Sequence, residues 1–192
     1  VYNRYGRRDN KYKARIKILV KALTPAGFAE RVEAEFAALD RHALALTAEQ
    51  ITTMREYFAP LAPAIDAQTV QARQRNLEQH QSQTQAFAQW LKQNTHAHNK
   101  SGYANVTLTL KTSHLPPGDV SDEQLDAIAE LADRYSFGQA RTTHNQNMVL
   151  TDVALDRLFD LWQALVPLHL ATPNRGTIND IICCPGGDFC AL

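Results

Sequence analysis

The sequence has no long apolar run, no excess of one charge and few cysteines. No segment has the length of a membrane span or the charged-then-apolar order of a secretory leader. Lys and Arg total 20 and Asp and Glu total 20, so no overall basic charge indicates nucleic acid or an anionic membrane as a partner. These absences predict a globular, cytoplasmic protein whose 192 residues form one domain with appendages or two small domains.

All three cysteines, Cys183, Cys184 and Cys190, lie within the last ten residues. A disulfide framework would distribute an even number along the chain, so this clustering indicates a metal site. Two thiolates on a short glycine-containing loop can reach one iron cluster, but two ligands do not hold it. Buried structural cysteines at a strand end are an equally good interpretation. Zinc is disfavoured, because the spacing is not C-x-x-C and adjacent cysteines rarely bind one tetrahedral ion well.

The first 59 residues predict helices with a basic beginning. Residues 1–21 carry eight Lys or Arg and one acid, which favours a solvated helix face over an arm for an anionic partner. Apolar residues at helical spacing predict helices over 10–23 and 24–40, and a capping box at 47–50 begins a third. The apolar residues that the second helix is expected to bury are Phe28, Val32, Phe36 and Leu39.

Residues 60–85 contain two prolines and a Gln-rich run with few apolar side chains. Such a stretch cannot bury enough surface by itself to offset its ordering entropy. We therefore predict a polar linker that needs something to lie on. A short helix around Phe87, Trp90 and Leu91 follows it.

The rest of the chain predicts an α+β unit. The predicted elements are a strand over 103–111, a helix from Ser121, strands over 140–143 and 148–150, a helix over 155–165 capped by Asp152, and a strand over 180–183. This β-α-β-β-α-β order is the ferredoxin-like arrangement. The residues expected to face inward are Val106, Leu108, Leu110, Leu125, Ile128, Ala129, Ala132, Leu158 and Trp162.

A polar corner, Thr143-His144-Asn145-Gln146-Asn147, lies between the two middle strands. Its amide and hydroxyl groups could bind carboxylates, and Arg141 could add a bidentate ion pair. Taken alone, these residues favour a polar hairpin turn, which Asn and His tolerate well.

Five motifs in order resemble the second half of the sulfite and nitrite reductase haemoproteins. They lie at 103–111, 116–119, 135–138, 141–147 and 180–190, and the resemblance runs from about residue 95 to 192. The basic helix near 11–21 is more loosely similar to the end of that family's first sirohaem-side domain. The implied organisation is a helical segment over 1–59, a linker with a helix over 60–99, and a ferredoxin-like half-domain over 100–192.

The resemblance implies a parent enzyme that reduces sulfite to sulfide or nitrite to ammonia at a sirohaem coupled to a 4Fe-4S cluster. By the family's pattern, Cys184 and Cys190 form the first pair of cluster ligands, and Cys183 is a neighbour. The corner residues that resemble the cofactor-facing segment are Arg141, Thr143, Asn145, Gln146 and Asn147. The electron donor would be a ferredoxin or a flavoprotein.

The second cysteine pair and most of the first repeat are not in these 192 residues. We therefore expect the chain alone to bind no cofactor, to have no complete catalytic site and to be inactive. The alternative is a cofactor-free ferredoxin-like module for binding or assembly. The sequence does not distinguish sulfite from nitrite as the substrate.

Overall fold

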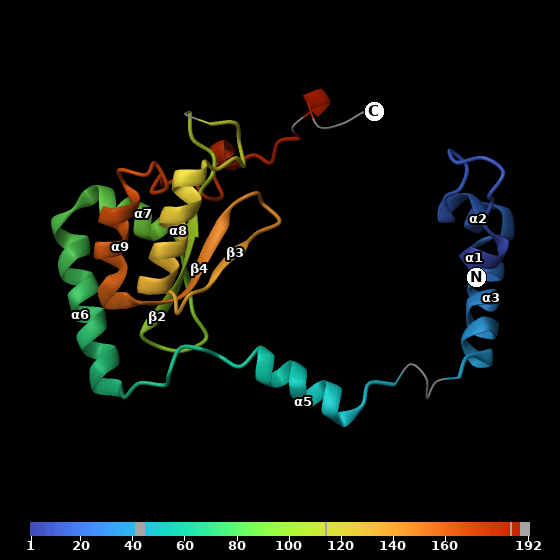
Figure 1. The fold of residues 1–192 in the computed structure, drawn as a ribbon, viewed down its shortest axis with the longest axis horizontal. Coiled ribbons are helices and arrows are strands. Elements are labelled where there is room, and N and C mark those ends of the chain that lie inside the picture. Colours follow the sequence, from blue (N-terminus) through green and yellow to red (C-terminus); the bar gives the residue numbers. More distant parts are fainter. Residues whose placement is uncertain (41–44, 114, 185, 189–192) are drawn as a thin grey trace. The chain divides into compact units, whose positions relative to one another are not determined.

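The computed structural model describes residues 1–40, 45–113, 115–184 and 186–188. The chain divides into two compact units, Val1–Ala59 and Pro60–Leu192, each with its own internal contacts. Figure 1 shows the chain coloured along the sequence. No helix in the described ranges combines the length and the apolarity needed to cross a membrane.

The N-terminal unit is helical throughout its described elements. These are α1 (Tyr2–Tyr5), α2 (Ile16–Leu23), α3 (Pro25–Ala38) and α5 (Ala48–Tyr57). The predicted start of α3 is confirmed, because the Thr24 side chain accepts a hydrogen bond from the Gly27 backbone at 3.3 Å. The capping box that begins α5 is also present.

Helix α2 begins six residues later than the predicted residue 10. The side chain of Asn10 accepts hydrogen bonds from the backbone N–H groups of Tyr12 at 3.0 Å and Lys13 at 3.3 Å. Such a local turn competes with helix formation, so the helix starts only after it.

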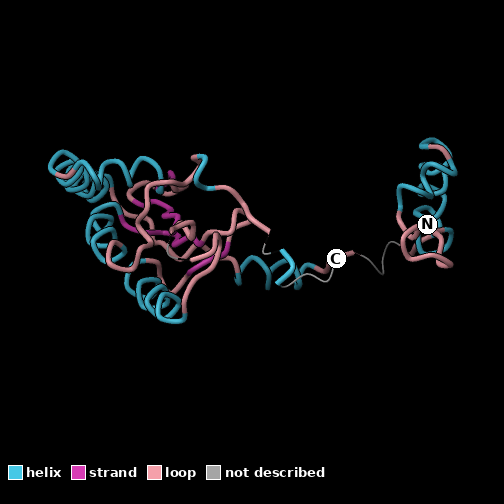
Figure 2. The backbone as a smooth tube through the Cα atoms, turned by 90° about the horizontal axis from the view of Figure 1, so that it is seen from above, coloured by secondary structure: helices cyan, strands magenta, loops and turns pink. Residues whose placement is uncertain are grey.

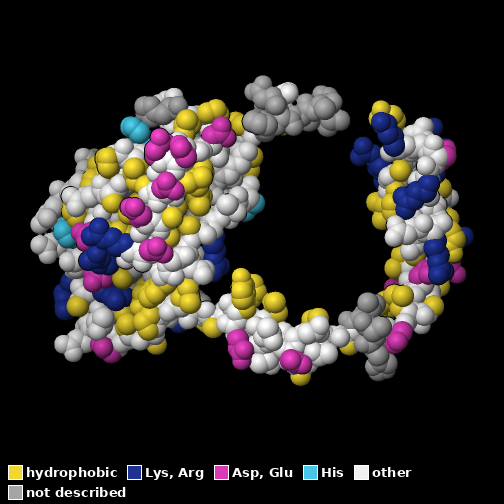
Figure 3. Space-filling view, in the orientation of Figure 1, with side chains coloured by type: hydrophobic (Ala, Val, Ile, Leu, Met, Phe, Trp, Pro, Cys, Tyr) yellow, Lys and Arg dark blue, Asp and Glu magenta, His cyan; other side chains and the backbone are white. Residues whose placement is uncertain are grey.

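The predicted burial by α3 is wrong. Val32, Phe36 and Leu39 are 37, 50 and 50% exposed, and none of the four described helices of this unit contains a buried residue. Figure 3 shows apolar side chains on the surface of this unit beside Lys and Arg. Helical spacing creates an apolar face, but only a second element laid over that face buries it.

The C-terminal unit combines helices with one sheet. Its elements are α6 (Ala67–Gln83), α7 (Gln85–Asn94), β1 (Thr95–Ala97), β2 (Tyr103–Leu108), α8 (Asp122–Tyr135), β3 (Ala140–Thr142), β4 (Met148–Ala154), η1 (Leu155–Arg157), α9 (Leu158–Leu165), η2 (Ile178–Asp180) and η3 (Gly186–Asp188). Figure 2 shows the strands bordered by helices. The α+β, ferredoxin-like class predicted from the sequence is confirmed.

The sheet has the order β1-β2-β4-β3, with every neighbouring pair antiparallel. The predicted last strand over 180–183 is wrong: a single 3₁₀ turn, Ile178–Asp180, is followed by residues that join no strand. The fourth strand is instead β1, which pairs with one edge of β2 while β4 pairs with the other. Both edges of β2 are therefore occupied before the chain reaches residue 180.

One hydrophobic core joins the sheet to its helices. Val106, Leu108, Leu110, Ile128 and Leu158 all belong to it, and Trp162 packs against it, as predicted. Leu125 and Ala129 do not, because both are exposed, Leu125 by 46%. The buried positions of α8 are Ile128, Leu131, Ala132 and Tyr135. Strand β2 was predicted to be half-buried, yet five of its six residues are buried.

The Gln-rich stretch, predicted as a polar linker that needs something to lie on, is largely a helix, α6. Asp66 caps the helix, accepting a hydrogen bond from the Thr69 backbone at 2.8 Å. Gln is a good helix former, and the few apolar residues suffice because Leu77 is buried in the common core. His80, near the end of α6, stacks on Phe159 with ring centroids 4.2 Å apart. The segment thus lies on the C-terminal unit as a helix.

Asp152 does not cap the last helix. It lies inside β4 with a positive φ of 60°, and its Oδ1 is 3.0 Å from His98 Nε2. Helix α9 begins at Leu158 after the 3₁₀ turn η1 and has no side-chain cap. Strand pairing by β4 through Ala154 prevents Asp152 from standing at the helix start.

Candidate functional site

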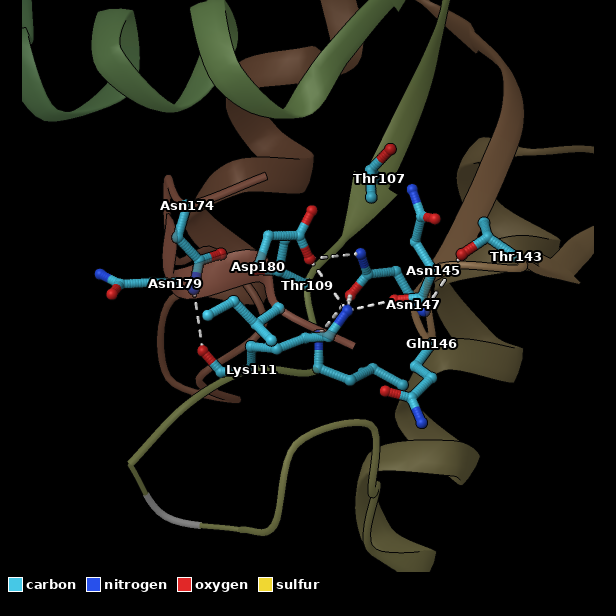
Figure 4. A network of polar contacts seen from close by, with 12 residues as sticks. Thr107, Thr109, Lys111, Thr143, Asn145, Gln146, Asn147, Asn174, Asn179 and Asp180 are labelled. Atoms are coloured by element: carbon cyan, nitrogen blue, oxygen red, sulfur yellow. Dashed lines mark hydrogen bonds and ion pairs between the residues drawn. The ribbon is translucent and has the colours of Figure 1, made fainter. Parts of the chain in front are cut away.

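The candidate site contains a buried lysine, Lys111, three residues after the end of β2. The side chain of Lys111 is 3% exposed, and its Nζ donates to Asp180 Oδ1 at 2.9 Å and to Asn147 Oδ1 at 3.0 Å. It also donates to the backbone carbonyl of Asn145. Figure 4 shows these groups meeting between the hairpin and the C-terminal segment. The ammonium therefore has three acceptors, which is what a buried charge requires.

Asp180 is the partner carboxylate, and its side chain is 5% exposed. Oδ1 also accepts from Asn147 Nδ2 at 2.9 Å, and Oδ2 accepts from the Gly176 backbone N–H at 2.8 Å. Burial acts to raise the pKa of Asp180, but the hydrogen bonds from Asn147, Gly176 and Lys111, with the Lys111 charge, outweigh it and lower that pKa below its ordinary value. Asp180 is thus held as a carboxylate.

The polar corner forms a closed hairpin between β3 and β4. The backbone N–H of Thr143 donates to the Asn147 carbonyl at 2.8 Å, and the Asn147 N–H donates to Thr143 Oγ1 at 3.1 Å. The buried Asn147 side chain also accepts from the Leu110 backbone N–H at 3.1 Å. Asn147 therefore joins the hairpin, the end of β2 and Asp180.

Gln146 binds the backbone just before the candidate metal ligand. Its Nε2 donates to the Cys183 carbonyl at 2.6 Å, and its Oε1 accepts from the Cys183 N–H at 2.9 Å. Gln146 has a positive φ of 55° and lies against Gly118, where an added Cβ would be 3.0 Å from the Gln146 Cβ. The loop around Gly118 and the corner therefore support one another through this close approach.

The two described cysteines differ in exposure. Cys184 is exposed and its Sγ accepts from the Gly186 backbone N–H at 3.4 Å, whereas Cys183 is half-buried. An exposed sulfur beside a backbone donor fits a thiolate ligand for iron. Cys190 lies outside the described residues, so the predicted pair Cys184 and Cys190 stays a prediction. Within the described ranges, no group of three or more His, Cys, Asp or Glu could hold a metal.

The five predicted cofactor-binding residues divide into two groups. Thr143, Gln146 and Asn147 are engaged within the chain. Arg141 is exposed on the edge strand β3 and donates to Gln139 at 3.0 Å, and the Asn145 side chain has no hydrogen-bond partner among the described residues. Arg141 and Asn145 therefore fit an external carboxylate better than the other three do.

Sequence reasoning assigned no role to Lys111 or Asp180. Both stand inside motifs that carried the family resemblance, and a lysine ending an apolar strand was the available signal. Asn174 also belongs to this site, because its Nδ2 donates to the Lys111 carbonyl at 2.8 Å. A pocket of about 370 Å³ adjoins Lys111 and Asn174.

Comparison with known proteins gives a family match for the middle of the C-terminal unit. Residues 106–168 match the model of the nitrite/sulfite reductase ferredoxin-like half domain. This part of the chain is therefore similar to the ferredoxin-like half domain of the sulfite and nitrite reductases, as its motifs predicted. No solved structure gives a significant match.

The matched relatives are ferredoxin-dependent nitrite reductases. The chain is 39% identical over 69 residues to the assimilatory ferredoxin-dependent nitrite reductase of Haloferax mediterranei, which is 34% of this chain and 11% of the relative. It is 32% identical over 89 residues to the ferredoxin–nitrite reductase of Synechococcus elongatus, 40% of this chain and 15% of the relative. It is 28% identical over 78 residues to the chloroplastic enzyme of Arabidopsis thaliana, 40% of this chain and 13% of the relative.

Proposed function

We propose that these residues are part of a longer cytoplasmic reductase that uses sirohaem and a 4Fe-4S cluster to reduce nitrite or sulfite. Nitrite as substrate and ferredoxin as electron donor are favoured over sulfite and a flavoprotein, because the matched relatives carry those names. The observation that supports the proposal is that the polar corner, which resembles the family's cofactor-facing segment, forms hydrogen bonds with Asp180 and Cys183, directly before Cys184.

In this proposal each group has a definite task. Cys184, with Cys190, would supply thiolates to the cluster, and the Gly186 N–H donates to the Cys184 sulfur. Arg141 and Asn145 would bind carboxylates at the periphery of the sirohaem. The cofactors, when bound, supply the electron chemistry of a six-electron reduction. Lys111, Asp180, Gln146 and Asn147 hold the corner and the cysteine segment together.

The 192 residues contain only one of the family's two cysteine pairs. We propose that the chain alone binds no four-iron cluster, because two thiolates lose the chelation that favours metal binding. Iron analysis and a visible spectrum of the purified 192-residue chain test this, and an iron–sulfur cluster bound by a single chain would refute it.

The parent enzyme provides the test of function. Cys184→Ser and Cys190→Ser should each abolish cluster assembly and nitrite reduction, because a hydroxyl is a far poorer ligand for iron than a thiolate. Cys183→Ser is the matched control and should retain much of both. Arg141→Ala and Asn145→Ala should weaken sirohaem retention by about 1–3 kcal/mol each.

Iron content, sirohaem absorbance and reduction of nitrite and sulfite by a reduced dye are measured on each variant. A parent protein without sirohaem absorbance would favour the cofactor-free binding module instead. If none of the three cysteine replacements affected iron content, the proposal would fall.

A further inference from the structure

Cys183 and Cys184 are adjacent, so the position of the backbone decides which of the two thiols faces outward. In extended backbone, successive side chains point to opposite sides, so a slip of one residue exchanges Cys183 for Cys184. The backbone is extended at Ile181, directly after Asp180, with φ −68° and ψ 135°, and residues 181–184 belong to no helix or strand. They join no strand of the sheet, so no ladder of hydrogen bonds sets their register. Other contacts must do so.

The first such contact is at Asp180. Its carboxylate receives hydrogen bonds from Lys111, Asn147 and Gly176, all between 2.8 and 2.9 Å. The side chains of Lys111 and Asp180 are 3% and 5% exposed. Moving Asp180 would leave Lys111 buried without its counter-charge, which is costly. The chain is thereby anchored upstream of the cysteines.

The second contact is the pair of hydrogen bonds from Gln146. One amide group binds both the N–H and the carbonyl of Cys183, at 2.9 and 2.6 Å. The backbone N–H and carbonyl of Cys183 are therefore both hydrogen-bonded, as they would be beside a neighbouring strand. The Gln146 backbone N–H donates to the Thr143 carbonyl at 3.3 Å, and its side chain lies close to Gly118, where an added Cβ would be 3.3 Å from Gln146 Cδ.

With these two contacts in place, the thiols of Cys183 and Cys184 differ in exposure. Cys183 is half-buried, with its Sγ 3.8 Å from the Ile181 carbonyl, and Cys184 is exposed. We infer that Gln146 is a positioning residue that selects Cys184 rather than Cys183 as the outward thiol. As a statement about a metal ligand the inference rests on the proposed function, but the selection itself is a property of the metal-free chain.

Thiol reactivity in the 192-residue chain tests the inference. Two single-thiol chains are compared, one with Cys183→Ser and Cys190→Ser and one with Cys184→Ser and Cys190→Ser. Each is made with the native Gln146, with Gln146→Met, with Gln146→Glu and with His144→Ala. His144 is an exposed residue of the same hairpin and serves as the matched control. The rate of reaction with a disulfide reagent is measured for each chain.

With native Gln146, Cys184 should react about tenfold or more faster than Cys183, because exposing Cys183 requires breaking two hydrogen bonds. Gln146→Met removes both bonds at similar side-chain size, so the ratio should fall to about threefold or less. Gln146→Glu keeps an acceptor for the Cys183 N–H and should give an intermediate ratio. His144→Ala should leave the native ratio.

Equal rates with native Gln146, or a ratio unchanged by Gln146→Met, would overturn the inference. Circular dichroism reports whether the methionine variant is folded. If it is not, the glutamate variant decides, and an unchanged ratio there counts against the inference. Because these chains contain no metal, absence of iron and sirohaem from the parent would refute the proposed function without altering the rates.

Discussion

The two units of the chain have similar helix signals and opposite burial. Helices α3 and α5 begin with side-chain caps, as α6 and α8 do. Yet none of the helices described within Val1–Ala59 contains a buried residue, whereas Phe87, Trp90 and Leu150 of the other unit are 0% exposed. Caps and periodicity specify where a helix forms, while burial depends on the surfaces that pack against it.

Ion pairs in the two units also differ in burial. The ion pair between Arg4 and Glu35, at 2.7 Å, has side chains that are 69 and 25% exposed. The pair between Lys111 and Asp180, at 2.9 Å, has side chains that are 3 and 5% exposed. Two pairs of similar length therefore lie in very different surroundings, and their removal should have different consequences.

Replacing matched phenylalanines should separate the units most strongly. Phe87→Ala should cost the C-terminal unit about 4 kcal/mol, because it leaves a cavity in the core. Phe36→Ala, at a side chain that is 50% exposed, should cost less than about 1 kcal/mol. Urea unfolding followed by tryptophan fluorescence measures the C-terminal unit, since Trp90 and Trp162 both lie in it, and circular dichroism measures the N-terminal unit. Equal losses would remove the contrast.

Removing one carboxylate from each ion pair should have the next largest effect. Asp180→Ala leaves the Lys111 ammonium buried without its counter-charge and should destabilise the C-terminal unit by about 3 kcal/mol. Glu35→Ala should change stability by about 0.5 kcal/mol or less, because its pair is largely solvated. The same urea titration, with circular dichroism added for the N-terminal unit, gives both values. A small effect of Asp180→Ala would show that the buried pair contributes little.

Acid should weaken the C-terminal unit through Asp180. Its pKa in the folded state lies below the ordinary 3.8, so its contribution is complete above that pH and is lost as the pH falls through the folded pKa. Asp180→Asn should therefore flatten the fall in unfolding free energy below pH 3.8 relative to the native chain. Urea titrations at a series of pH values measure the slope. Parallel slopes for the two chains would contradict the assignment.

Removing helix caps should give the smallest effect and sharpen the comparison. Asp66→Ala should cost the C-terminal unit about 1 kcal/mol, because α6 is packed into the core through Leu77. Thr47→Ala should lower the protection of α5 amides from hydrogen exchange without changing the tryptophan-detected transition. A shift of that transition by Thr47→Ala would mean that the two units are coupled.

Much of the fold was predictable from local chemistry. The starts of α3, α5 and α8 follow from Thr24, Thr47 and Ser121, the strand β2 follows from apolar alternation, and β3 and β4 were predicted as strands flanking the polar corner. These signals depend on residues two to four positions apart, so they are present in the sequence itself. The motifs likewise predicted the similarity of residues 106–168 to the nitrite/sulfite reductase half domain.

The incorrect predictions of secondary structure and burial concern segments whose conformation depends on contacts with residues distant in sequence. The Gln-rich stretch becomes helix α6 because the core covers Leu77, and residues 180–183 form no strand because β1 and β4 occupy both edges of β2. Leu125 faces solvent although its spacing fits the inner face of α8. In each case the local pattern permits two outcomes, and packing selects one.

For the candidate site, the sequence by itself determined the residue types: a polar corner, a basic residue after a strand and a cysteine cluster. Only the tertiary structure brought Lys111 to Asp180 and Gln146 to Cys183, across 69 and 37 positions of sequence. Hydrogen bonds and ion pairs act over about 3 Å, so partners this far apart in sequence meet only after the sheet and its hairpin have formed. The sequence therefore predicted which groups could bind a cofactor, and the fold decided which of them also form hydrogen bonds within the chain.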